Sequence, residues 1–154
     1  NLEKNIVSEA IYKSILIKKN YVLKDEKEKL KNKNSRAILN FGHTFGHALE
    51  TNYKYNNKLT HGEAISIGMI IAAQLSFNLN YLSSNELKKI KNHFININLP
   101  INDEQMFHKK IFSIISKDKK NYNGNINFVL IKNIGSAFIK KISLEVIKKN
   151  CKII

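Results

Sequence analysis

Apolar residues recur every three or four positions along most of this chain, which is the spacing of one face of an α-helix. The first such run covers residues 2–17 and includes Leu2, Ile6, Ala10 and Ile17. Residues 25–35 are charged and of low complexity, and we interpret them as a solvated connection or surface helix. A second apolar run at residues 36–52 predicts one amphipathic helix.

Two capping boxes indicate where later helices begin. In the segment Thr60–Glu63 a threonine is followed three residues later by a glutamate, a pattern in which each side chain caps the other residue's backbone. The helix that it opens, residues 62–79, is apolar on nearly all sides, so we expect it to be the central buried helix. Ser83–Glu86 repeats the pattern and predicts a helix to about Asn96.

After Pro100 the pattern predicts one more helix, then two strands and a last short helix. We expect Asn102 to open another helix whose apolar stripe is Phe107, Ile111, Ile114 and Ile115. Residues 126–131 and 134–139 then read as two short strands, and Ser143 starts a last short helix. The predicted fold class is mainly α, a multi-helix domain with a short antiparallel β-hairpin near residues 126–139.

One polar stripe holds residue types that are rare in this chain. On an ideal helix, residues stepping by 4, 3, 4, 3 and 4 form a single narrow face, and six polar residues do so here: Arg36, Asn40, His43, His47, Glu50 and Lys54. The stripe contains the only arginine and two of the five histidines. Histidines at i and i+4 suit two ligands of a divalent metal, or one ligand beside a substrate-contacting imidazole. The spacing alone leaves both open, and His61 in the next helix adds a further imidazole.

Small residues predict close packing of these two helices. Gly42 and Gly46 are four residues apart, as are Ala64, Gly68 and Ala72 on the following helix. Glycine inside a helix costs up to about 1 kcal/mol relative to alanine, so close backbone approach is the physical reason to expect. Such packing would bring His43 near His61.

Composition narrows the class of protein. The chain has 154 residues and a net charge of +14, and 43% of its residues are hydrophobic, which is enough for a packed core. Lysines are spread along the whole chain, so a nucleic-acid-binding module is disfavoured, and no apolar run predicts a membrane span. A single cysteine, Cys151, excludes a disulfide framework. We expect one domain over residues 1–154 in a cytoplasmic setting, without a nucleic-acid or membrane partner.

Two segments, LNFGHTFGHALE and HGEAISIGM, closely resemble the C-terminal domain of the 3-dehydroquinate synthase family. Outside them, Ser14, Lys18 and the acidic segment at residues 25–28 resemble further family positions, as do the segment at residues 118–120 and Ile134-Gly135. The resemblance implies the helical, C-terminal half of a two-domain enzyme. It also implies that the N-terminal NAD-binding domain lies outside this chain, which contains no GxGxxG motif.

The activity implied by the resemblance belongs to the shikimate pathway of aromatic amino acid (chorismate) biosynthesis. A 3-dehydroquinate synthase is a carbon–oxygen lyase that converts 3-deoxy-arabino-heptulosonate 7-phosphate, an anionic sugar phosphate, into 3-dehydroquinate and phosphate. It uses NAD and Zn2+ or another divalent metal such as Co2+, and we expect the full-length enzyme to be a homodimer. The isolated domain is expected to be inactive.

The resemblance also implies roles for individual residues. His43 and His61 match two metal ligands, and the family's third ligand is a glutamate of the other domain. His47 and Lys18 match catalytic, substrate-contacting positions, and no NAD-binding residue is expected in this chain. The substrate-binding residues are Lys18, Arg36, Asn40, His47 and one of Lys119 or Lys120.

Two related activities remain as alternatives. Other sugar-phosphate cyclases share the fold and the two-histidine metal pattern, although Arg36 and Asn40 favour a substrate with a carboxylate. A glycerol-dehydrogenase-like metal enzyme has a related fold but would not be expected to carry the whole GHTxGHAxE string.

Overall fold

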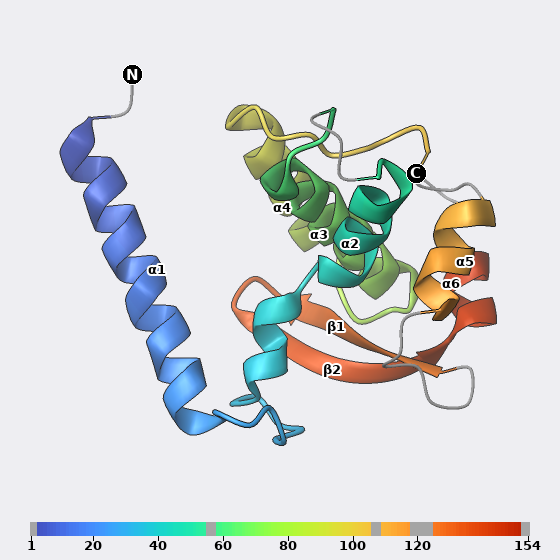
Figure 1. Cartoon of the computed structure of the whole chain (residues 1–154), viewed down its shortest axis with the longest axis horizontal. Helices are drawn as coiled ribbons and strands as arrows, with labels where there is room; N and C mark the ends of the chain where they lie inside the picture. The colour runs from blue at the N-terminus through green and yellow to red at the C-terminus, as the bar shows by residue number, and fades with distance from the viewer. Residues whose placement is uncertain (1–2, 55–57, 106–108, 118–124, 152–154) are drawn as a thin grey trace.

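The computed structural model describes residues 3–54, 58–105, 109–117 and 125–151. Figure 1 shows a bundle of helices resting on a two-stranded sheet, with the first helix standing to one side. The elements in chain order are α1 (Lys4–Lys24), the 3-10 helix η1 (Arg36–Asn40), α2 (His43–Asn52), α3 (His61–Asn78), α4 (Ser84–Asn96), α5 (Lys109–Lys117), β1 (Asn125–Asn133), β2 (Ser136–Ser143) and α6 (Leu144–Asn150). The predicted mainly helical fold with a C-terminal hairpin is therefore confirmed.

Helix α3 is the central element, as its apolar sequence predicts. Its N-terminus carries the predicted capping box, in which Thr60 accepts from the Glu63 backbone and the Glu63 carboxylate accepts from the Thr60 backbone. Beyond the first turn nearly every side chain of α3 is buried, so the helix contributes to packing on all sides. The second capping box is confirmed only in its first half. Ser83 caps the Glu86 backbone, but the Glu86 carboxylate binds Lys89 and the Ile134 N–H instead.

Two clusters of buried side chains surround α3. The larger joins α2, α3, α5, the hairpin and α6, and its large members include Phe45, Leu49, Ile67, Leu75, Ile111, Phe128, Leu130 and Ile147. The smaller joins α3 to α4 and the hairpin through Ile70, Ala73, Leu82, Leu87, Ile90, Phe94 and Ile131. Helix α2 is thus held between the core and solvent, with one face available for chemistry.

The hairpin pairs β1 and β2 antiparallel, with Asn127 opposite Lys141 and Val129 opposite Ile139. The prediction set the turn near Lys132, but β1 continues to Asn133 through a register irregularity, and the turn lies at Ile134-Gly135. Gly135 adopts a φ of +88°, a conformation that glycine accepts without steric cost. β1 is therefore three residues longer and β2 two residues longer than predicted.

The predicted helix over residues 36–52 is wrong in one respect, because it is broken at Gly42. Gly42 has a φ of +82°, which ends η1 and starts α2 in a new direction. Arg36 and Asn40 therefore belong to η1, whereas His43, His47 and Glu50 belong to α2. The polar stripe is not one continuous helix face, and tertiary structure determines which of its members meet.

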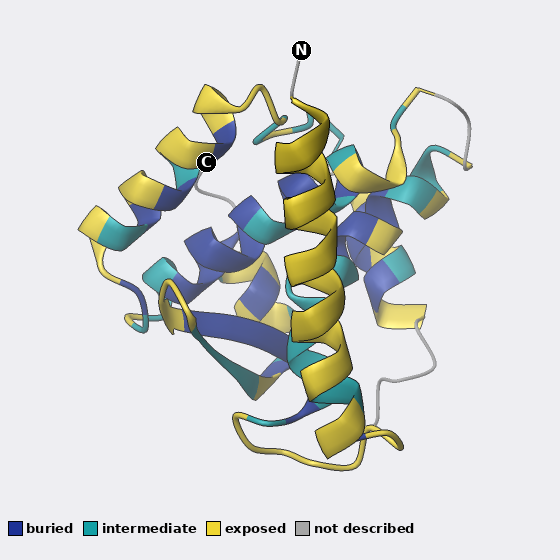
Figure 2. Ribbon diagram, turned by 90° about the vertical axis from the view of Figure 1, so that its left-hand side faces the viewer, coloured by how far each residue is buried: buried dark blue, intermediate teal, exposed yellow. Residues whose placement is uncertain are grey.

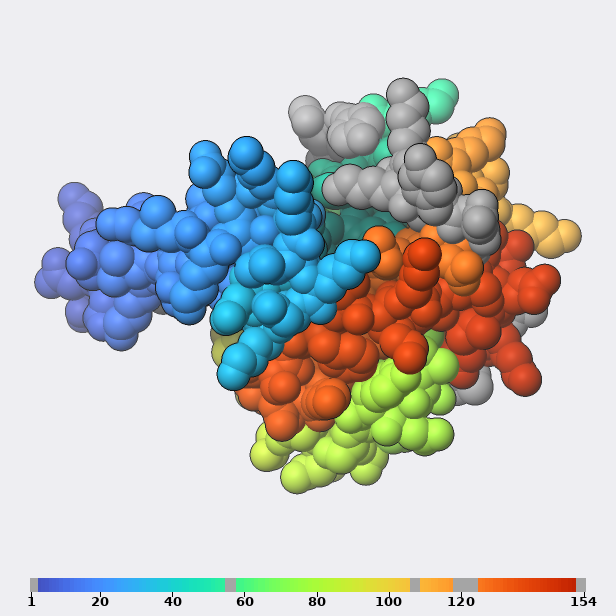
Figure 3. All heavy atoms as spheres, turned by 90° about the horizontal axis from the view of Figure 1, so that it is seen from below, coloured from blue at the N-terminus to red at the C-terminus, as the bar shows by residue number. Residues whose placement is uncertain are grey.

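Helix α1 is longer than predicted and differs from the other α-helices in having no buried residue. Figure 2 shows it exposed along most of its length, and Figure 3 shows it projecting from the body of the molecule. Several of its apolar residues, among them Ile11 and Ile15, are more than half exposed. Of the predicted apolar stripe, Ile6, Ala10 and Ile17 lie on α1 but cover no core within the described residues, and Leu2 lies outside them.

The connection at residues 25–35 is less solvated than expected, since Asp25 is only 5% exposed. Residues 102–105 are not helical, so Asn102 does not open a helix; α5 is assigned from Lys109, and Phe107 lies outside the described residues. None of the helices in the described ranges combines the length and apolar character that a membrane crossing requires.

Candidate functional site

Close packing of α2 against α3 builds the site. A Cβ on Gly68 would lie 2.8 Å from the Gly46 nitrogen, and one on Gly46 would lie 3.1 Å from the Ala64 carbonyl oxygen. Both distances are shorter than ordinary contacts of a real side chain, so only glycine lets these backbones approach so closely. The close packing predicted from the small residues is confirmed.

Three imidazoles meet where the two helices touch. The ring centroids of His43 and His61 are 6.1 Å apart, those of His47 and His61 are 6.0 Å apart, and those of His43 and His47 are 5.2 Å apart. The first two histidines are one turn apart on α2, and His61 is the first residue of α3. The predicted proximity of His43 and His61 is therefore confirmed, and His47 is equally close.

The environment of His43 favours the neutral imidazole. Burial lowers its pKa, and the nearby His47 and His61 act in the same direction. The hydrogen bond to the Phe41 carbonyl oxygen and the Glu50 charge oppose the shift without reversing it. Its Nδ1 lies 3.3 Å from that carbonyl oxygen, which places the ring proton on Nδ1. Nε2 is then the lone-pair nitrogen, which is the form in which histidine binds metals.

His61 is oriented by a carboxylate from the neighbouring helix. Its Nδ1 lies 2.9 Å from Oε1 of Glu50, whose side chain is only 12% exposed although that of His61 is 62% exposed. Side-chain atoms of His47, Glu50 and His61 also lie within 4.8 Å of one another, a spacing at which three groups could hold one metal ion. The short Glu50–His61 distance is, however, a hydrogen bond. Glu50 is therefore a hydrogen-bond partner of His61.

Two hollows lie next to the histidines. The first, of about 460 Å³, is formed between α1 and η1 and is lined by Ser14, Ile17, Lys18, Glu28, Arg36, Leu39, Asn40 and His43. It brings together four of the residues that the sequence analysis selected: Lys18, Arg36, Asn40 and His43. Lys18 and Arg36 supply positive charge, and Asn40 supplies an amide, so the hollow suits an anionic, hydroxylated molecule.

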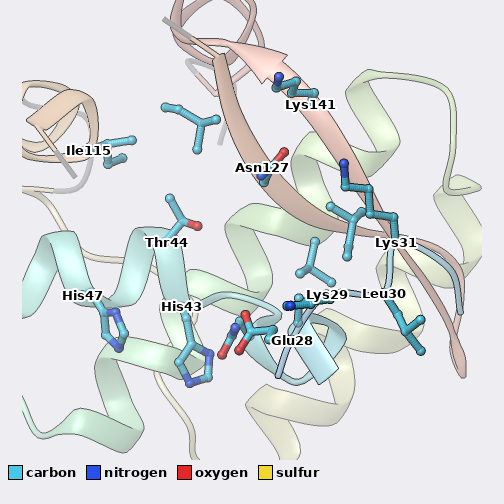
Figure 4. A pocket seen from close by; sticks show the side chains of 15 residues that line it. Glu28, Lys29, Leu30, Lys31, His43, Thr44, His47, Ile115, Asn127 and Lys141 are labelled. Atoms are coloured by element: carbon cyan, nitrogen blue, oxygen red, sulfur yellow. The ribbon is translucent and has the colours of Figure 1, made fainter. Parts of the chain in front are cut away.

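The second hollow, of about 490 Å³, lies between the 28–31 loop, the start of α2 and the hairpin. Figure 4 shows His43 and His47 side by side on α2 at one end of it, with Glu28 next to His43. At the other end are Asn127 and Lys141 from the paired strands. Asn40 and His43 line both hollows, so the two hollows border the same imidazole.

The loop before η1 determines where Arg36 lies. The buried Asp25 carboxylate accepts hydrogen bonds from the backbone N–H groups of Lys29 at 2.7 Å and of Arg36 at 3.0 Å. The Arg36 guanidinium donates to the Glu26 carbonyl oxygen at 2.9 Å, and its Nε lies 3.9 Å from the Glu28 carboxylate. The acidic segment thus folds around the arginine.

Of the predicted site residues, Lys119 and Lys120 lie outside the described residues. Two functional candidates were not given roles from the sequence. Glu50 lies on the same polar stripe as the histidines, but its contact with His61 depends on how α2 packs on α3. Glu28 lies in the acidic segment, and its position in both hollows depends on the loop that Asp25 organises.

The fold is shared with sugar-phosphate cyclases. The structure of 2-deoxy-scyllo-inosose synthase complexed with carbaglucose-6-phosphate, NAD+ and Co2+ matches with a TM-score of 0.62 and 24% identity, over 82% of this chain and 36% of that one. ValA, the 2-epi-5-epi-valiolone synthase of Streptomyces hygroscopicus with NAD+ and Zn2+ bound, matches with a TM-score of 0.64 and 21% identity, over 80% of this chain and 33% of that one.

Sequence comparison assigns the chain to a narrower family than the likeness in fold does. The family model for the 3-dehydroquinate synthase C-terminal domain matches residues 1–121, so the chain belongs to this family. It is 42% identical to the 3-dehydroquinate synthase of Pelagibacter ubique over 143 residues, which is 90% of this chain and 38% of that protein. It is 38% identical to the 3-dehydroquinate synthase of Thermoanaerobacter pseudethanolicus over 149 residues, which is 97% of this chain and 40% of that protein. The chain spans about two fifths of the length of these relatives.

Proposed function

We propose that this chain is the metal- and substrate-binding part of a 3-dehydroquinate synthase, which converts 3-deoxy-arabino-heptulosonate 7-phosphate into 3-dehydroquinate and phosphate. The observation that carries the proposal is the meeting of His43, His47 and His61 beside a hollow that contains Lys18 and Arg36. Family membership and the relatives named 3-dehydroquinate synthase support it. The aromatic biosynthetic role and the lyase activity follow from this proposal.

His43 and His61 would hold the divalent metal. Both rings have Nδ1 engaged by an oxygen acceptor, which leaves Nε2 as the donor atom of each, and two imidazoles suit Zn2+ or Co2+. The metal would supply Lewis-acid polarisation of substrate oxygens. Solved structures of the same fold contain NAD+ and Co2+ or Zn2+, which supports a divalent metal for this site. The remaining ligand and the NAD site would come from outside this chain.

The other residues would bind and orient the substrate. Arg36 has the planar fork that pairs with a carboxylate through two hydrogen bonds, and Asn40 and Lys18, which line the same hollow, would contact hydroxyl groups of the substrate. His47 lies on the far side of His43, towards the second hollow. We assign it to proton transfer near the phosphate, with one of Lys119 or Lys120 as a further cationic contact.

The exposed apolar residues of α1 are consistent with an active site that is completed by a second domain. An isolated apolar face of this kind indicates a surface covered by another polypeptide segment. In a two-domain enzyme with its active site between the domains, α1 would border the second domain, and Lys18 on this helix would face the substrate. Dimerisation would then be a property of the full-length enzyme.

A chimera tests the proposal. The corresponding segment of the T. pseudethanolicus enzyme would be replaced by this chain, and phosphate release from the heptulosonate would be measured with NAD and Zn2+. We expect turnover by the chimera and none by this chain alone. His43→Ala and His61→Ala should remove metal-dependent activity, and His47→Ala should lower kcat by about 10²–10⁴-fold.

His93→Ala is the matched control, because His93 is exposed on α4, a different helix from the three site histidines. It should leave the rate unchanged. A folded chimera that binds NAD but releases no phosphate would contradict the assigned activity. Full activity of the His43 or His61 variant would contradict the metal assignment alone.

A further inference from the structure

The Glu50 carboxylate is hydrogen-bonded to the histidine cluster, and the proposed reaction gives it no role. It lies one turn after His47 on α2 and reaches across to the first residue of α3. Two functions are open to such a group: it binds the metal directly, or it acts on the metal through a histidine. The geometry distinguishes these functions.

The contact between Glu50 and His61 has the length of a charge-assisted hydrogen bond. Oε1 lies 2.9 Å from Nδ1, within the usual 2.7–2.9 Å range for a charged N–H···O pair. For such a bond the proton must sit on Nδ1, because a carboxylate only accepts. A nitrogen that carries this proton has no lone pair for a metal, so the ligating atom of His61 is Nε2, on the opposite edge of the ring.

Burial explains why this contact matters for the ring. The His61 side chain is 62% exposed, so packing alone does not fix its rotamer. The capping box of Thr60 and Glu63 fixes the backbone of the first turn of α3 but does not touch the imidazole. The Glu50 side chain is 12% exposed and is carried by a helix whose backbone is packed against α3. A rigid acceptor therefore holds an otherwise exposed ring.

His43 provides an independent parallel. Its Nδ1 faces the Phe41 carbonyl oxygen at 3.3 Å, so it too presents Nε2. The centroids of the two rings lie 6.1 Å apart, and the Nδ1 atom of each ring faces an oxygen acceptor of this chain. A hydrogen bond donated by the ring nitrogen that does not bind the metal fixes the tautomer of a metal-binding histidine and raises the basicity of its other nitrogen.

We propose that Glu50 is a positioning residue, which fixes the Nδ1–H tautomer and the orientation of His61 so that Nε2 faces the metal. The inference rests on the metal site of the proposed function but not on its catalytic step. It predicts that the amide of glutamine, which still offers an oxygen acceptor, replaces much of the Glu50 function. Alanine cannot replace it. A direct ligand would behave differently, because a neutral amide is a far poorer ligand than a carboxylate.

The first test needs no metal. The chain is labelled with ¹⁵N-histidine, and the tautomer of His61 is read from its long-range ¹H–¹⁵N correlations, with His61→Ala used for assignment. We expect the Nδ1–H tautomer in the unsubstituted chain and in Glu50→Gln, and a shift towards Nε2–H in Glu50→Ala. A His61 tautomer unchanged by Glu50→Ala would overturn the proposal.

The second test measures Co2+ affinity by competition with a chromophoric chelator. Loss of an outer hydrogen-bond partner should weaken binding by about 10–100-fold in Glu50→Ala, and by less in Glu50→Gln. Glu9→Ala is the control, since it removes the same charge from the exposed α1. In the background of His61→Ala, the Glu50→Ala change should have no further effect. Equal loss in the glutamine and alanine variants, or an undiminished effect without His61, would identify Glu50 as a ligand and contradict the proposal.

These readouts separate the two proposals. The tautomer and the metal affinity are measured without substrate or NAD, whereas the proposed function is tested by phosphate release. A chimera that is inactive while Glu50→Ala changes the His61 tautomer would contradict only the assigned reaction.

Discussion

Gly68 on α3 lies directly against the carbonyl oxygen of Gly42, at the start of α2, so that a Cβ on Gly68 would overlap with this oxygen. The same Cβ would lie 2.8 Å from the Gly46 nitrogen. Both obstacles are backbone atoms, which cannot move aside as the end of a flexible side chain can. This contact sets the distance between the helices that carry His43 and His61.

Gly68→Ala should therefore destabilise the protein. Overpacking against fixed backbone costs about 1–3 kcal/mol, which exceeds the gain of up to about 1 kcal/mol from the better helix propensity of alanine. Urea unfolding followed by circular dichroism measures the change in the free energy of unfolding. If α2 is displaced, Co2+ affinity should fall as well.

Gly62→Ala is the matched control in the same helix. A Cβ on Gly62 would meet no atom within 4 Å, so only the better helix propensity of alanine would affect the free energy of unfolding. We expect unchanged or slightly increased stability. Equal destabilisation by both substitutions would contradict the role given to the close approach.

Ser76→Ala should cost about 1–3 kcal/mol of stability. The buried Ser76 hydroxyl donates to the Ala72 carbonyl oxygen at 2.7 Å and accepts from the Ile131 N–H at 3.1 Å, which joins α3 to β1. Alanine leaves the Ile131 N–H buried without this partner. Ser116→Ala removes an exposed hydroxyl on α5 that bonds only locally, and it should change stability by less than about 0.5 kcal/mol.

Asp25→Asn should destabilise the loop that positions Arg36 and should flatten the acid dependence of stability. Burial alone would raise the pKa of Asp25, but hydrogen bonds from the backbone N–H groups of Arg36, Leu30 and Lys29 and from the Ser35 hydroxyl outweigh it and lower the pKa. A lowered folded-state pKa means that the stabilisation is complete above the unfolded-state value of about 3.9 and is lost as the pH falls through the folded-state value.

Urea midpoints of the unsubstituted chain and of Asp25→Asn, measured between pH 7 and pH 3, test this expectation. The difference between the two should shrink towards the acid end. The neighbouring exposed Glu26 offers the control Glu26→Gln, which should keep the full acid dependence. A difference that grows on acidification would contradict the assignment to Asp25.

Cys151 should be unreactive in the folded chain. The side chain is 1% exposed, and burial raises the pKa of its thiol to about 12. Because the thiolate is the nucleophile, alkylation by iodoacetamide at pH 8 should be at least about 100-fold slower than in the urea-unfolded chain. Labelling followed by mass spectrometry measures both rates, and similar rates would show that the C-terminal end of α6 is not packed as described.

Local patterns determined much of the architecture from the sequence. The capping residue Thr60 and the apolar run after it place the start of α3 and its central position, because both depend on residues within a few positions of each other. The histidine spacing and the LNFGHTFGHALE string likewise identify the family from the sequence alone. The strand ends and the start of α5 were less accurate, since pairing across the hairpin extends the strands beyond their apolar residues.

Other features depend on contacts between distant segments. The left-handed conformation of Gly42 divides the polar stripe in two. The stripe pattern does not reveal it, because glycine is compatible with both a continuous and a broken helix. The burial of Asp25 depends on donors up to eleven residues away that only the folded loop supplies.

The sequence by itself thus determined which residue types form the site: three histidines, one arginine and the glycines that let two helices touch. Tertiary structure decided which of them meet. Glu50 and His61 are eleven residues apart and on different helices, and they form a hydrogen bond only because the α2 and α3 backbones pack without intervening side chains. Spacing along a chain defines the faces of single helices, whereas contacts between helices depend on the shape and packing of both surfaces.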